Sequence, residues 1–350
     1  MSSSAPRTKD PGYVASNGPA HHLSADDFAA KLRAEISGKV VLITGPSVGG
    51  LGFEAARVIA KHGADLVLAG RSQTKYALSH VPSIPGHCTE GMIIPRLDDA
   101  STAIKTETPS AKLRTLIVDM ASLASVASAA EAVNAYSEKI DVLINNASTL
   151  YETYTVTKDN IEATWETNHL GPFLFTKLID KHLANNARVV NVTSSAHAIQ
   201  PINFEDFTLG GGSNYQKWQS YGQSKTANML FSLQIGKEWK DIESFSVNPG
   251  VVATNIWKVI PFEEQVAMGF RDASGVWTSD FIGGARSIGQ GASGYITAAF
   301  DPSLKGHTGG YLVDAKMANE QAFSHATDSL SAEKLWKLSE NMLAKHIARQ

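Results

Sequence analysis

Strand-like and helix-like segments alternate along most of this chain, and this alternation constrains its fold more than any other feature. Short apolar runs typical of buried strands fall at residues 40–43, 65–68, 113–118, 141–144, 187–192, 244–247 and 310–313. Helix-like stretches lie between them, among them residues 53–61, 123–139, 161–183 and 221–240. Strands that alternate with helices form βαβ units with right-handed crossovers. The sequence therefore predicts an α/β fold with a doubly wound parallel sheet in a single domain.

Composition excludes several classes of function. The 350 residues are 43% hydrophobic and 19% charged, which suits a globular chain with a sizeable core. A net charge of −3 and the lack of a Lys/Arg cluster argue against nucleic acid or an anionic membrane surface as a partner. Cys88 is the only cysteine, so an intramolecular disulfide and a thiolate zinc cluster are excluded, and no metal site is predicted. Without an apolar run of about 18 residues or a secretory signal, we expect a cytoplasmic protein with no membrane span.

A glycine-rich segment, TGPSVGGLG at residues 44–52, joins the first predicted strand to a helix. Strand, glycine turn and helix are the setting of a Rossmann-like dinucleotide loop, whose helix N-terminus receives the pyrophosphate. The spacing is one residue longer than in the common T-G-x-x-x-G-x-G pattern, so residues 46–49 must bulge. The predicted cofactor contacts in this loop are Gly45, Ser47, Gly50, Leu51 and Gly52. An alternative register uses Gly49 in place of Gly50.

Five further motifs follow the glycine loop in a fixed order. They are NNAS (145–148), NHLGPF (168–173), VVNVTSSAH (189–197), YGQSK (221–225) and NPGVVAT (248–254). As an ordered set they resemble the short-chain dehydrogenase/reductase superfamily, and within it the retinol-dehydrogenase-like group. The resemblance spans residues 39–343 and includes GHTGGYLVDA at 306–315 and KLWKLSENML at 334–343. It implies an oxidoreductase that moves hydride between a nicotinamide cofactor and a carbonyl or alcohol carbon.

A tyrosine followed four residues later by a lysine is the pattern that predicts an acid–base catalyst. Two such pairs occur, Tyr221–Lys225 and Tyr154–Lys158, but only the first follows a hydroxyl-rich strand end and opens a helix-like segment. On a helix, residues i and i+4 share a face, so an ammonium can lie beside the phenol. A nearby cation moves the phenol pKa from near 10 toward the working range. We therefore predict Tyr221 as the general acid/base, and Tyr154–Lys158 as a surface pair.

The resemblance supplies the other catalytic roles. Spacing alone leaves Thr193, Ser194 and Ser195 as candidates for the hydroxyl that binds the substrate oxygen, and alignment with the family motif NVSSxAH places it on Ser195. Asn168 matches the asparagine that holds a water in a proton relay behind the lysine, and Lys225 would also bind the nicotinamide ribose. The predicted catalytic set is Asn168, Ser195, Tyr221 and Lys225.

The end of the second strand determines which nicotinamide is predicted. An NAD site carries Asp or Glu there, about 20 residues past the glycines, whereas this strand ends in LAGRS with Arg71. An arginine fork suits a 2′-phosphate, so NADP(H) is predicted; an Arg71 that is merely solvated would leave the preference open. By resemblance, the remaining cofactor contacts are Asp119, Asn146, Ala147, Tyr221, Lys225, Pro249, Gly250, Val252 and Thr254.

Three segments interrupt the regular pattern. Residues 1–37 are predicted to be a flexible leader plus a short amphipathic helix that starts at a Ser24–Asp27 capping box, and residues 38–350 the dehydrogenase domain. Residues 76–112 contain four prolines and are interpreted as an insertion-like loop. Residues 255–282 are rich in apolar and aromatic side chains, which indicates a substrate lid and an apolar small-molecule substrate.

Two other functions are compatible with parts of this pattern. An epimerase or dehydratase uses the same scaffold without net consumption of the cofactor, and a non-catalytic NADP-binding sensor would keep only the nucleotide site. The complete Asn-Ser-Tyr-Lys set favours the oxidoreductase over both. A homo-oligomer is compatible with the sequence.

Overall fold

An eight-stranded sheet forms the centre of the protein in a computed structural model that describes residues 23–71, 97–278 and 286–348. The strand order is β3-β2-β1-β4-β5-β6-β7-β8, and every neighbouring pair is parallel except β7 and β8. The strands are β1 (Val40–Thr44), β2 (Asp65–Gly70), β3 (Leu113–Ile117), β4 (Ile140–Asn145), β5 (Leu183–Val192), β6 (Glu243–Asn248), β7 (Tyr311–Val313) and β8 (Lys316–Met317). The predicted doubly wound sheet is confirmed.

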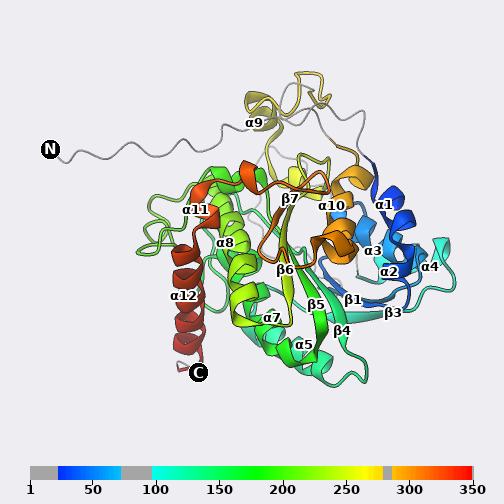
Figure 1. Cartoon of the computed structure of the whole chain (residues 1–350). Coiled ribbons are helices and arrows are strands. Elements are labelled where there is room, and N and C mark those ends of the chain that lie inside the picture. The colour runs from blue at the N-terminus through cyan, green and yellow to red at the C-terminus, as the bar shows by residue number, and fades with distance from the viewer. Residues whose placement is uncertain (1–22, 72–96, 279–285, 349–350) are drawn as a thin grey trace.

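Helices cover both faces of this sheet (Figure 1). One layer consists of α5 (Leu123–Asn134), α7 (Gly171–Leu178), α8 (Lys217–Glu238) and α12 (Ser329–Ile347). Its apolar side chains, such as Phe173, Phe231 and Trp336, form one buried core with the sheet. The other layer consists of α1 (Ala25–Lys31), α3 (Leu51–Lys61), α4 (Leu97–Glu107) and α10 (Ile288–Phe300). Ile59 and Ile296 lie in the second core, so both faces of the sheet are buried.

Four short helices complete the described part of the chain: α2 (Arg33–Ile36), α6 (Ala163–Trp165), α9 (Phe262–Ala267) and α11 (Ser324–Thr327). The predicted capping box is present at the start of α1, where the Ser24 amide donates to the Asp27 carboxylate at 2.8 Å and the Asp27 amide donates to Ser24 Oγ at 3.3 Å. The leader before residue 23 lies outside the described residues.

Two predicted segments differ from the structure. The stretch 76–112, interpreted as an insertion-like loop, contains the helix α4, because Leu97, Ala100 and Ile104 recur at helical spacing and are buried against the sheet; residues 76–96 lie outside the described part. The stretch 161–183 is not one helix. It contains α6, one π-helical turn over Glu166–Leu170, and α7. The sheet order matches the dinucleotide-binding arrangement, whose crevice opens where the chain reverses direction between β1 and β4.

Candidate active site

The predicted site residues come together at one edge of the sheet. Six of them follow the carboxyl ends of parallel strands: Gly45 after β1, Arg71 after β2, Asp119 after β3, Asn146 after β4, Ser195 after β5 and Pro249 after β6. In open α/β sheets this edge, at the switch point of the strand order, is where ligands bind.

The glycine loop absorbs its additional residue in a tight turn. The Gly50 amide donates to the Ser47 carbonyl at 2.9 Å, and Gly50 is then the N-cap of α3. No side chain caps this helix, so the N–H groups of its first turn point to an open end. Gly45 has a φ of +68°, and a Cβ there would lie 2.9 Å from the Ala147 Cα. An uncapped helix N-terminus beside a glycine turn fits the pyrophosphate of a dinucleotide.

The Asn146 side chain supports the glycine loop through hydrogen bonds to its backbone. Its Nδ2 donates to the Thr44 carbonyl at 2.9 Å and to the Gly45 carbonyl at 3.0 Å, and the Tyr295 hydroxyl donates to its Oδ1 at 2.9 Å. A Cβ on Gly52 would lie 2.4 Å from Asn146 Nδ2, so a side chain at position 52 would collide with the Asn146 amide. The Asn146 side chain therefore holds the loop, and Tyr295 of α10, which sequence reasoning missed, holds Asn146.

Tyr221 and Lys225 lie on one face of α8, as their spacing predicts. The helix begins at Lys217, one turn before Tyr221, and the Lys225 Nζ lies 5.3 Å from the centre of the Tyr221 ring. Lys225 is 2% exposed and donates to the Val192 carbonyl at 3.1 Å. Burial lowers the pKa of Lys225 to about 7. An ammonium has three N–H donors, which leaves this one able to bind a second partner.

The hydroxyls beside Tyr221 bear on two sequence expectations. Burial raises the pKa of Tyr221 to about 12, contrary to the lowering expected from the neighbouring Lys225, and the side chains of Ser194 and Ser148 act against that rise. Of the two serines after β5, Ser194 is thus the one that acts on the Tyr221 pKa, whereas the resemblance points to Ser195. The reason is local: Ser194 has the extended backbone of a cap, and Ser195 is already the first residue of a 3-10 helix that ends at Ala198. Ser148, where the family motif has glycine, is a further hydroxyl that sequence reasoning did not assign.

Asn168 lies in the π-helical turn, a distortion often found at functional sites. Its Oδ1 accepts from the Thr149 amide at 2.7 Å, and its Nδ2 donates to the Thr149 carbonyl at 2.9 Å and to Ser224 Oγ at 3.0 Å. Ser224 Oγ donates in turn to the Tyr221 carbonyl at 2.7 Å. The Asn168 side chain therefore joins the segment after β4 to the turn of α8 that carries Tyr221.

An apolar wall surrounds Tyr221. Leu150, Ala196 and Ile260 pack with it in one buried cluster, with Trp218, Ile256 and Trp257 partly buried against them. Residues 255–278 of the predicted lid contain α9 and the 3-10 turn Asn255–Val259, while residues 279–282 lie outside the described part. Glu264 of α9 accepts from the Trp218 indole at 2.7 Å and pairs with Lys217. The described part of this segment is thereby anchored to the first turn of α8.

Arg71 and Asp119 follow the carboxyl ends of β2 and β3. Burial raises the pKa of Tyr151, Arg71 lowers it and Asp119 raises it, so both charges act on the same phenol. Arg71 is exposed at the carboxyl end of β2. Asp65 starts the same strand and pairs with Lys112 at 3.4 Å, too far along the strand to contact a ribose at its other end.

The segment after β6 is held by a buried ion pair. Arg286 binds Asp314 through two bonds of 2.6 and 2.8 Å, and its amide donates to the Val251 carbonyl at 2.8 Å. The Val252 carbonyl accepts from the Trp257 indole and the Thr254 amide, both at 2.8 Å. Since that carbonyl is engaged, a cofactor contact at Val252 would have to use its N–H group.

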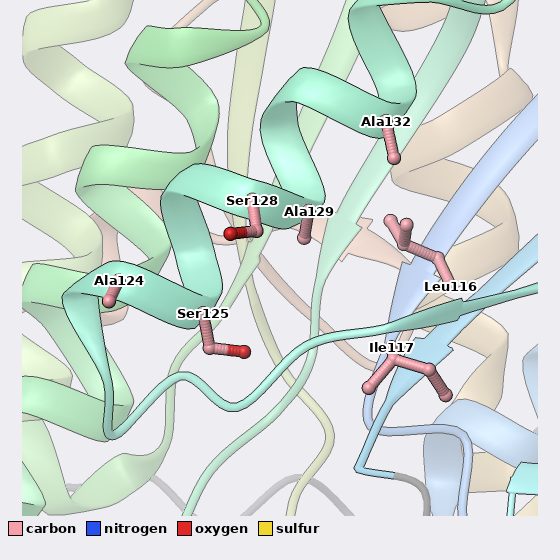
Figure 2. A pocket seen from close by; sticks show the side chains of 7 residues that line it. All are labelled: Leu116, Ile117, Ala124, Ser125, Ser128, Ala129 and Ala132. Carbon is pink, nitrogen blue, oxygen red and sulfur yellow. The ribbon is translucent and has the colours of Figure 1, made fainter.

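Two hollows in the described structure differ in the side chains that line them. Figure 2 shows one of about 490 Å³, where Leu116 and Ile117 of the edge strand lie opposite small side chains of α5, among them Ser125 and Ala129. It holds no charged group among its lining residues and lies outside the cluster around Tyr221. The other, of about 400 Å³, opens between the glycine loop and the lid.

Comparison of the sequence with known proteins identifies its family. The family model for short chain dehydrogenases matches residues 91–265. Retinol dehydrogenase 12 of Mus musculus is 31% identical over 323 residues, which cover 88% of this chain and 87% of that protein. The chain belongs to the short-chain dehydrogenase family. The short-chain dehydrogenase TIC 32 B, chloroplastic, of Brassica napus is 30% identical over 314 residues, covering 85% of this chain and 86% of the relative.

A solved structure has a similar fold. A Mycobacterium paratuberculosis protein aligns with a TM-score of 0.63 and 25% identity, covering 89% of this chain and 97% of that one. This short-chain dehydrogenase is thus an oxidoreductase of a family that uses nicotinamide cofactors and acts on small molecules. Among the described residues, no helix is both long and apolar enough to span a membrane.

Proposed function

We propose that this short-chain dehydrogenase is an NADPH-dependent reductase of a ketone or aldehyde carbonyl in a lipophilic small molecule. The observation that carries the proposal is the group formed by Tyr221, Ser194 and Lys225. Two hydroxyls and an amine from different elements meet at the carboxyl edge of the sheet, beside the uncapped N-terminus of α3.

The residues divide the chemistry between them. NADPH, when bound, supplies the hydride. The Tyr221 hydroxyl donates the proton that the carbonyl oxygen needs, and Ser194 Oγ holds that oxygen through a hydrogen bond that strengthens as negative charge develops. Lys225, with N–H groups beyond its bond to Val192, stabilises the phenolate that Tyr221 leaves behind.

The protonation state of Tyr221 favours reduction. Burial raises its pKa to about 12, so at neutral pH the phenol carries its proton and is ready to act as an acid. Asn168 acts through Ser224 and keeps the Tyr221 turn in place. The proposed catalytic residues are therefore Ser194, Tyr221 and Lys225, with Asn168 as a positioning residue.

The environment of the site supports the substrate class and the cofactor. Leu150, Ile260 and Trp218 pack around Tyr221, so a bulky apolar body beside the carbonyl would be desolvated favourably. Arg71 is exposed at the end of β2, and the next four residues of the sequence, SQTK, include no Asp or Glu. Its guanidinium suits the 2′-phosphate of NADPH.

Calorimetric titration of NADPH and NADH against the purified protein tests the proposal. We expect NADPH to bind tighter, and Arg71→Ala to remove about ten- to hundredfold of NADPH affinity while leaving NADH unchanged. Arg33→Ala, an exposed arginine on α2, is the matched control. Tighter NADH binding in the wild type would refute the cofactor assignment, and Tyr221→Phe retaining carbonyl reduction would refute the mechanism.

A further inference from the structure

The hollow of about 400 Å³ between the glycine loop and the lid has the composition of a ligand site. We call it the lid pocket. Three aromatic rings line it, from Trp257, Phe262 and Trp277, together with the cations Lys258 and Arg271. Its volume lies within the range of small-molecule sites, and no Asp or Glu is among its lining residues.

Arg271 is held in one orientation before any ligand binds. Its Nε donates to Gln265 Oε1 at 2.8 Å, and its Nη1 donates to the Gly275 carbonyl at 2.6 Å. The guanidinium lies over the Trp277 ring, 4.0 Å from its centre. Gln265 is itself fixed, because its Nε2 donates to the carbonyls of Trp257 and Ile260. Within the described residues the Arg271 Nη2 group has no bonded acceptor, so a fixed pair of N–H donors is available.

The nearby carboxylates do not neutralise this cation. Glu264 is bound by Lys217 and the Trp218 indole. The Asp272 carboxylate accepts from the Ser274 and Val276 amides inside its own turn. Lys258 is exposed and adds a second positive charge to the wall. The lid pocket therefore combines apolar surface with positive charge, which is complementary to an amphipathic anion.

We propose that the lid pocket binds the carboxylate end of an amphipathic ligand, an apolar chain or ring system that carries one carboxylate. The carboxylate receives the Nη2 donors of Arg271, and the apolar body lies against Trp257, Phe262 and Trp277. Trp257 also belongs to the cluster around Tyr221, so this ligand lies next to the space proposed for the carbonyl. The proposal concerns binding, and because Gly49 and Thr254 of the proposed cofactor crevice also line the pocket, the ligand would lie beside the cofactor.

Tryptophan fluorescence tests it without turnover, because Trp257 and Trp277 line the pocket. Decanoate is titrated into the full-length protein, with 1-decanol and acetate as probes of each half of the ligand. We expect saturable quenching by decanoate, and binding at least about tenfold weaker for the other two. Equal affinity for decanoate and 1-decanol would overturn the proposal, since the charge would then contribute nothing.

Three variants locate the site. Arg271→Met should weaken decanoate binding about ten- to hundredfold, and Lys258→Glu about fivefold by placing a negative charge in the wall. The Lys258 side chain makes no hydrogen bond with another described residue, so its replacement should leave the lid intact. Arg114→Met is the matched control, because Arg114 also lies over a ring, that of Tyr136 at 4.3 Å, but outside the pocket. Unchanged binding in Lys258→Glu, or equal loss in Arg114→Met, would overturn the assignment.

Discussion

At the scale of single residues, the two adjacent serines after β5 are predicted to differ in their effect on catalysis. The Ser194 side chain lowers the pKa of Tyr221 against the effect of burial, and Ser195 starts the following 3-10 helix. We expect Ser194→Ala to lower kcat for carbonyl reduction about a hundredfold, because a donor to the developing oxyanion is lost. Ser195→Ala should change kcat less than about threefold, as expected of a surface-turn substitution. Steady-state kinetics of both variants at saturating NADPH give the answer, and a larger loss in Ser195→Ala would return the role to that residue.

Lys225 gives a second prediction at this scale. Its pKa is lowered by burial to about 7, so the charge that stabilises the Tyr221 phenolate is lost as the pH rises through that value. Tyr221, with a pKa of about 12, stays protonated over the same range. We therefore expect kcat for reduction to fall as the pH rises from about 6 to about 9, and Lys225→Met to show a lower kcat with a flatter profile. A wild-type profile that is flat across this range would contradict the prediction.

The same residues show how far sequence reasoning reaches. The Tyr221–Lys225 spacing was sufficient to place both on one helix face, because helical periodicity is a local property. Helical periodicity could not show which of the three consecutive hydroxyl residues at 193–195 lies next to Tyr221. Which of them meets Tyr221 depends on where the chain leaves its extended conformation, and that point is fixed by packing against α8.

At the scale of elements, the additional residue of the glycine loop makes a contact with the lid. Asn255 Nδ2 donates to the Val48 carbonyl at 3.1 Å, so the loop and the segment after β6 are joined across the proposed cofactor crevice. We expect Asn255→Ala to raise the NADPH dissociation rate about fivefold with little change in the association rate. Stopped-flow fluorescence of NADPH measures both rates.

A matched asparagine provides the control for this experiment. Asn134 Nδ2 donates to the Leu178 carbonyl at 2.9 Å, between α5 and the end of α7. Asn134→Ala removes the same type of hydrogen bond on the opposite layer and should leave both rates unchanged. Equal dissociation rates in wild type and Asn255→Ala would show that the contact does not retain the cofactor.

Elements differ in how well the sequence predicts them. The buried strands followed from their apolar runs, since all five residues of β1 are buried. The helix α4 was missed because prolines dominate its neighbourhood and its own apolar positions, Leu97, Ala100 and Ile104, are few. The π-helical turn over Glu166–Leu170 was not predicted, because apolar periodicity does not distinguish it from the α-helices on either side of it.

At the scale of the whole molecule, a buried carboxyl group, that of Glu166, makes the stability of the fold depend on pH. Burial raises the pKa of Glu166 to about 8, a hydrogen bond from Thr157 opposes the rise, and Asp159 and Asp119 add to it. His346 of α12 lies 3.6 Å from Asp159. Because the pKa of Glu166 in the folded protein differs from its ordinary value, its protonation is linked to the stability of the fold.

The sign of that linkage follows from the raised pKa. Glu166 has a pKa of about 8 in the folded protein and an ordinary value of 4.5, so the folded state binds more protons between these values. Its contribution to stability is complete below about pH 4.5 and is lost as the pH rises through about 8. Glutamine keeps the shape of the protonated acid and cannot ionise. We expect Glu166→Gln to match the wild-type melting temperature near pH 5 and to exceed it by a few degrees near pH 9.

Thermal unfolding of the two proteins across this pH range measures the difference. Lys225 acts in the opposite direction, because its lowered pKa adds stability as the pH rises, but it is present in both proteins and cancels in the comparison. Glu131→Gln, an exposed carboxyl on α5, should follow the wild type at every pH. Parallel curves for wild type and Glu166→Gln would mean that Glu166 ionises as freely in the folded chain as in the unfolded one, and would contradict the prediction.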